Sequence, residues 1–86
     1  MAYQLKIIRR AYKELRKLPP DITRRLRDAI NDLAGDPHPR GCQKLRGGVG
    51  YAIRVGSYRV VYDIDDDARV VTVLRAGHRK SVYRSL

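Results

Sequence analysis

Apolar residues recur at two spacings along this chain, one typical of helices and one typical of strands. Residues 3–8, "YQLKII", alternate in part and contain β-formers, so a first strand is expected there. Residues 9–18, "RRAYKELRKL", place alanine and leucines on one helical face, and "PP" stops that helix. Pro20 suits the first turn of a second helix, whose apolar stripe follows at steps of three or four residues: Ile22, Leu26, Ile30 and Leu33.

Beyond Gly50 the apolar period changes to two. Residues 51–64, "YAIRVGSYRVVYDI", predict two strands joined at Gly56-Ser57, because glycine at the first central position is typical of a two-residue hairpin turn. Residues 69–76, "RVVTVLRA", predict another strand, and a short helical segment is expected from Arg79.

The turn-rich segment 35–48 separates the two halves of this pattern and holds a short extended piece around "QKLR". The element order is then β-α-α-β-β-β. It predicts an α+β fold in which a mostly antiparallel sheet packs on a helical hairpin, with a short C-terminal helical segment. At 86 residues, a single domain over 1–86 is expected.

The two-residue turn also predicts which side chains of the hairpin are neighbours. With Gly56 and Ser57 as the loop, Arg54 faces Arg59 across the strands, on the side opposite the apolar pairs. Like charges placed in this way destabilise a hairpin unless an anion lies between them. A phosphate gripped by two guanidinium groups is the natural anion, and two arginines pointing separately into water are the plainer alternative.

Composition supports an anionic partner. The net charge is +10, from 19 Lys and Arg against 9 Asp and Glu, which favours nucleic acid or an acidic protein. Cys42 is the only cysteine, and three of the four aspartates at 63 and 65–67 lie in a tight turn, so no metal and no other cofactor is expected. No apolar run is long enough to span a membrane, and the chain is expected to be cytoplasmic with no membrane partner.

The last twelve residues, "RAGHRKSVYRSL", are basic and hold no carboxylate. They are either a solvated tail or one wall of a site. Because helices cover one side of the expected sheet, this segment has room to cross the other side. That path would bring Arg79 and Tyr83 near Arg54 and Arg59.

Four segments resemble the RelE/ParE superfamily of bacterial and archaeal toxins, and the RelE branch in particular: "RAYKELRKLPPDI", "KLRG", "YAIRVGSYRVVYDID" and "VVTVLRAGHRKSVYR". The resemblance covers essentially the whole chain. It implies an endoribonuclease that enters the ribosomal A site, cleaves messenger RNA and is held inactive by a cognate antitoxin. It also implies metal-independent cleavage, in which the substrate's 2′-OH attacks the adjacent phosphate and leaves a 2′,3′-cyclic phosphate.

The resemblance further implies roles for single residues. Arg54 and Arg59 match positions that hold the scissile phosphate, and Arg79 matches an arginine that stabilises the transition state or leaving group. Tyr83 matches a tyrosine that stacks on or orients the nucleotide, and His78 lies where relatives often carry a basic residue. Ala52 departs from the pattern, which has a lysine there as a base, so the candidate bases are Tyr83 and His78. Further contacts to RNA are expected from Lys80, Arg75, Lys44 and Arg46.

Two other functions are compatible with the same sequence. A ParE-like toxin inhibits DNA gyrase and needs no nuclease site, and a catalytically inactive basic module would only bind RNA or act within a repressor complex. A shared fold does not separate these functions, because function depends on the site. The C-terminal His, Arg, Lys and Tyr set favours the nuclease.

Overall fold

The computed structural model describes residues 2–45, 47 and 50–84. Its elements confirm the predicted α+β order and add a two-residue strand within the expected extended piece. In chain order they are β1 (Gln4–Ile7), α1 (Arg9–Arg16), α2 (Pro20–Asp32), β2 (Gln43–Lys44), β3 (Tyr51–Val55), β4 (Tyr58–Asp65), β5 (Val70–His78) and α3 (Arg79–Arg84). No helix in these described ranges is long and apolar enough to cross a membrane.

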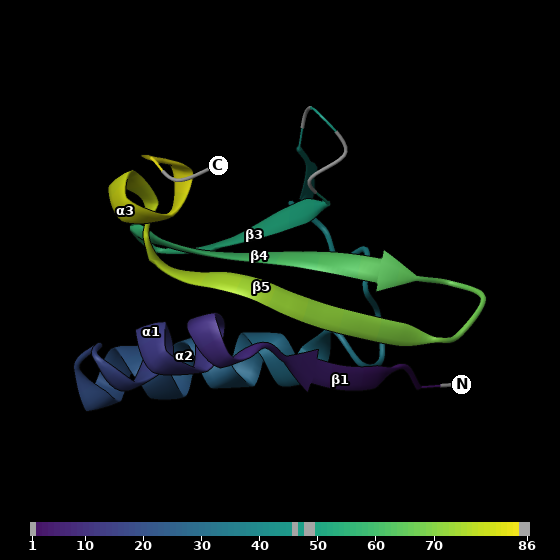
Figure 1. Cartoon of the computed structure of the whole chain (residues 1–86), viewed down its shortest axis with the longest axis horizontal. Helices are drawn as coiled ribbons and strands as arrows, with labels where there is room; N and C mark the ends of the chain where they lie inside the picture. The colour runs from purple at the N-terminus through teal and green to yellow at the C-terminus, as the bar shows by residue number, and fades with distance from the viewer. Residues whose placement is uncertain (1, 46, 48–49, 85–86) are drawn as a thin grey trace.

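All five strands form one sheet in the order β1-β5-β4-β3-β2. Strand β1 runs parallel to β5, and the other neighbours are antiparallel. Figure 1 shows α1 and α2 on one side of the sheet and α3 on the other side, at the end where β3 and β4 meet. The sheet therefore has a helical hairpin on one face and a single short helix on part of the other.

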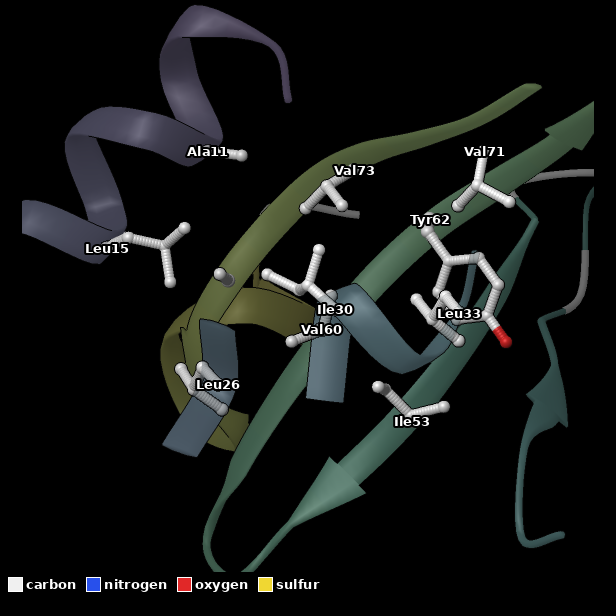
Figure 2. Close-up of a cluster of buried hydrophobic side chains, with 11 residues drawn as sticks. Ala11, Leu15, Leu26, Ile30, Leu33, Ile53, Val60, Tyr62, Val71 and Val73 are labelled. Carbon is white, nitrogen blue, oxygen red and sulfur yellow. The ribbon is translucent and has the colours of Figure 1, made fainter. Parts of the chain in front are cut away.

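The main core lies between the helical hairpin and the sheet (Figure 2). The helical stripes predicted from spacing face inward, and each fully buried aliphatic side chain contributes about 1.5–3 kcal/mol to folding. Its largest fully buried members are Tyr62, Leu26, Ile30, Leu33, Val60, Val71 and Val73. This core fixes which face of the sheet is turned away from the hairpin, and the site arginines lie on that outer face.

The β3–β4 pairing has the predicted register. Arg54 pairs with Arg59, and the pairing continues to Tyr51 with Tyr62. The outer face is not bare, however, because Ala52 and Val61 are fully buried with Val82 of α3 in a second, small apolar cluster. Residues 79–84 are therefore a helix docked on the sheet and not a solvated tail.

Gly50 precedes β3 in a conformation that only glycine adopts readily, with φ of 105°. A Cβ atom at this position would lie 2.4 Å from the backbone oxygen of Tyr62. Gly50→Ala is therefore expected to lower the free energy of unfolding by about 1–3 kcal/mol, measured by urea titration. The matched control is Gly35→Ala, where the added Cβ meets only one atom, at 3.8 Å. Equal stability of the two variants would contradict the assignment of strain to Gly50.

Candidate phosphate-binding site

The β3–β4 hairpin places two arginines side by side on the outer face of the sheet. Arg54 is exposed, and Arg59 is half-buried. The Nη1 group of Arg59 donates hydrogen bonds to the carbonyl oxygens of Gly56 at 3.2 Å and Tyr58 at 3.0 Å. These bonds hold the Arg59 guanidinium against the turn, so one of the two cations is oriented before any ligand arrives.

The start of α3 lies against the same turn. The backbone N–H of Arg79 donates to the carbonyl oxygen of Ser57 at 3.0 Å. In the sheet, Gly77 pairs with Arg59, which places the end of β5 beside the hairpin. The side chains of Arg79 and Lys80 are exposed at the start of this helix. The structure thus brings the backbone positions of Arg54, Arg59 and Arg79 to one corner of the molecule, as the sequence predicted.

Arg54 and Arg59 also line a cleft of about 580 Å³ beside the part of β3 that does not pair with β2. Its other wall comes from Ala29 and Asp32 of α2, from the loop 39–42 and from Gln43 of β2. Arg40 of that loop lines the cleft and adds a cation that the sequence reasoning did not single out. Arg40 lies in a turn-rich segment whose residues follow no regular period, so the sequence did not indicate which surface its side chain would face.

The corner is strongly cationic. Among the described residues, the one ion pair within 4 Å joins Arg75 to Glu14, and it involves none of the arginines at 54, 59 and 79. The described part of the chain also holds no group of three metal-ligating side chains. Guanidinium groups without a carboxylate partner are suited to bind phosphate, because their N–H groups can grip its oxygens two at a time.

Arg75 does not lie with these cations. Its side chain is almost fully buried, at 7% exposure, and its guanidinium contacts the Glu14 carboxylate. Val61, its partner in β4, belongs to the small cluster beneath α3. The predicted contact of Arg75 with RNA does not fit this burial, because its donors are used inside the protein. Nothing in its local sequence distinguishes it from the exposed arginines.

His78 lies on the other face of the sheet from Arg59. It pairs with Tyr58, and the two rings meet edge to face with centroids 5.8 Å apart. Its Nδ1 atom accepts a hydrogen bond from the backbone N–H of Lys80 at 3.3 Å, as a cap on the first turn of α3. In the neutral ring this bond leaves the proton on Nε2. The geometry therefore places His78 as a helix cap and separates it from the arginine pair.

The remaining predicted site residues are placed as follows. Lys44 is exposed in β2 and pairs with Tyr51, so alternation puts it on the face opposite Arg54. The structure describes the backbone of Tyr83 in α3 and not its side chain, and Arg46 lies outside the described residues. Position 83 follows position 79 by four residues, which puts both on the same side of α3.

Two other residues near the site are unsuited to accept a proton. Ala52 is buried and has no side-chain group that accepts a proton, so it does not replace the lysine that the family pattern has at this position. Burial raises the pKa of Tyr62 far above its usual value, and its hydroxyl donates to the carbonyl oxygen of Pro37 at 2.7 Å. Tyr62 is thus a neutral core residue, and Tyr83 remains the candidate base.

Comparison with known proteins gives a consistent picture. A family model described as the ParE toxin of the type II toxin-antitoxin system parDE matches residues 4–83. Toxin RelG of Mycobacterium tuberculosis is 36% identical over 86 residues, covering 98% of this chain and 99% of that protein. A chain of the M. tuberculosis toxin-antitoxin complex RelBE2 superposes with a TM-score of 0.82 and 33% identity, covering 92% of this chain and 100% of that one. A free mutant of Escherichia coli toxin RelE gives a TM-score of 0.79 with 33% identity over the full length of both.

Proposed function

This chain belongs to the RelE/ParE family of type II toxins, in its RelE-like branch, and on that premise we propose that it is a ribosome-dependent endoribonuclease. Its substrate is messenger RNA in the ribosomal A site, and its action stops translation in the cytoplasm. The observation that carries the proposal is the meeting of Arg54 and Arg59 with the start of α3 at one cationic corner.

The arginines perform the electrostatic part of the reaction. In-line attack of the 2′-OH on the adjacent phosphorus adds negative charge to the phosphoryl oxygens and to the departing 5′ oxygen. Guanidinium groups already held in place stabilise this charge without reorganising at the moment of reaction. Arg59, fixed by the carbonyl oxygens of its own turn, and Arg54 bind the phosphoryl oxygens. Arg79 stabilises the transition state or the leaving oxygen.

The attacking 2′-OH must also lose a proton. Arginine remains protonated and does not accept it. His78 is on the opposite face of the sheet and its Nδ1 atom is engaged in capping α3. Tyr83, on the same side of α3 as Arg79, takes the proton or orients the nucleotide by stacking.

A cognate antitoxin is the natural protein partner. Solved relatives include the RelBE2 complex of M. tuberculosis and the intact RelBE complex of E. coli, which pair a toxin with its antitoxin. A net charge of +10 attracts an acidic, amphipathic segment. We expect the antitoxin to cover the cationic corner or displace α3. Full nuclease activity in the purified complex would contradict this expectation.

A translation extract tests the activity itself. The toxin is added to programmed ribosomes and the ends of the messenger RNA are mapped. Codon-linked cuts that persist in EDTA under conditions that keep ribosomes intact, with 5′-OH and 2′,3′-cyclic phosphate ends, support the nuclease. Intact messenger RNA together with trapped gyrase–DNA breaks would instead support the ParE-like alternative, and RNA binding without cleavage would support the inactive module.

A further inference from the structure

Helix α3 cannot hold its own position. It has six residues, Arg79–Arg84, and helices this short are marginal in water without tertiary contacts. Besides the His78 cap on its first turn, its contacts with the rest of the described chain are at three places. Its first N–H is bonded to the hairpin turn, Val82 is buried against Ala52 and Val61, and the far end lies over Arg75. Because α3 carries Arg79 and Tyr83, these contacts decide where two of the proposed site residues lie.

Arg75 reaches the far end of α3 from β5. Its Nη1 group approaches the carbonyl oxygen of Val82 at 3.4 Å, and its Nη2 group approaches that of Ser81 at 3.5 Å. These carbonyls belong to the last turn of the helix, where no intrahelical N–H is available to them. A buried positive charge at this end also interacts favourably with the helix dipole. Arg75 therefore provides N–H donors to carbonyl oxygens of α3 that have no intrahelical partner.

Glu14 of α1 holds Arg75 in this orientation. Its Oε2 atom lies 2.8 Å from Nη2 of Arg75, and both of its carboxylate oxygens accept from Nε at 3.1 Å. Its Oε1 atom also accepts from the backbone N–H of Ala76 at 3.2 Å. Strand β1 pairs with β5 only as far as Val73. Glu14 therefore accepts a backbone hydrogen bond from the part of β5 that has no β1 partner. Figure 1 shows α1 and α3 on opposite sides of the sheet at this end of β5.

We propose that Glu14 is a positioning residue for the nuclease site, acting through Arg75 to fix α3, and with it Arg79 and Tyr83, against the sheet. The effect on cleavage rests on the proposed function, whereas the effect on α3 does not. Among the described residues, Glu14 is the one carboxylate that forms an ion pair, and it lies on a helix whose other charges, all basic, are exposed. A purely solubilising charge would not be turned inward to a nearly buried guanidinium.

Glu14→Gln tests the link, because glutamine keeps the length and an acceptor for Ala76 but removes the charge. We expect hydrogen exchange of the α3 amides to accelerate about tenfold relative to β4 and β5. Single-turnover cleavage at saturating ribosomes should fall about 100-fold, with unchanged half-saturation, because the mutation misplaces reacting groups and leaves the ribosome contacts alone. Asp28→Asn on the exposed side of α2 makes the same change of charge and should leave both readouts unchanged.

The double variant Glu14→Gln/Arg75→Met separates positioning from stability. Replacing both members of this partly buried pair removes the uncompensated charge, so the melting temperature should recover relative to Glu14→Gln. Exchange of α3 and the cleavage rate should not recover, because the helix end has lost its cation. Recovery of cleavage together with the melting temperature would overturn the proposal. If the wild-type chain does not cleave at all, the proposed function fails, and the exchange measurements alone decide whether Glu14 positions α3.

Discussion

Arg79→Ala is expected to lower the rate of messenger RNA cleavage by about 10²–10³-fold, the usual cost of removing one preorganised donor from a developing oxyanion. The side chain is exposed at the start of α3, and the backbone N–H of the same residue is bonded to Ser57. Alanine keeps that backbone bond and favours the helix, so the loss should come from the missing guanidinium and not from a displaced α3. Ribosome binding should weaken little, because 18 of the 19 lysine and arginine side chains remain.

The measurement is single-turnover cleavage on programmed ribosomes, with circular dichroism as the check on folding. Arg24→Ala is the matched control, since it removes an exposed arginine from α2, on the face of the sheet away from the cationic corner. Codon-linked cleavage at the wild-type rate in the Arg79 variant would remove this residue from the proposed mechanism. An equal loss in both variants would point to a general loss of charge instead.

Arg54→Thr is expected to change stability and activity in opposite directions. Arg54 and Arg59 are direct cross-strand partners, and like charges in that position cost roughly 0.2–1 kcal/mol. Threonine removes the repulsion and favours a strand, so the free energy of unfolding should rise by about that amount. Cleavage should nevertheless fall by about 100-fold, because one of the two cations on the scissile phosphate is gone.

Urea titration and cleavage assays on the same preparation check both signs. Lys6→Thr is the control, since it removes an exposed cation from β1, where Lys6 pairs with Thr72, without relieving a paired arginine. A loss of both stability and activity in the Arg54 variant would mean that this arginine supports the hairpin itself. High salt should reduce the stability gain, because screening already weakens the repulsion that the substitution removes.

Much of the fold could be predicted because its information is local. The stripe of Ile22, Leu26 and Ile30 reports a helix within three turns, and the Gly56-Ser57 turn specifies the register of β3 and β4. The bulge between Val61 and Tyr62 and the parallel pairing of β1 with β5 could not be predicted in the same way. Each depends on how β5 pairs with another strand, and no short sequence pattern specifies which two strands become neighbours in the sheet.

The site residues also differ in whether their positions follow from nearby sequence or from contacts between distant segments. Arg54 and Arg59 were paired by a local turn, so their shared face followed from strand alternation. Arg75 and His78 were grouped with them because both belong to the basic C-terminal segment, and His78 also because relatives often carry a basic residue at its position. The structure turns Arg75 inward to Glu14, 61 positions away, and places His78 beside Tyr58 on the other face. Arg40 enters the cleft from a loop whose path is set by the packing around it.

The sequence by itself determined the helices, the hairpin, the arginine pair and the excess of positive charge, because each depends on spacing between near neighbours or on simple summation. Only the tertiary structure decided that the expected helical segment, residues 79–84, is docked on the sheet, and that Glu14 and Arg75 hold its end. Those outcomes require residues from α1, β5 and α3 to meet inside the protein. A buried charge needs a partner, and the three-dimensional packing decides which of the many charged residues can reach it.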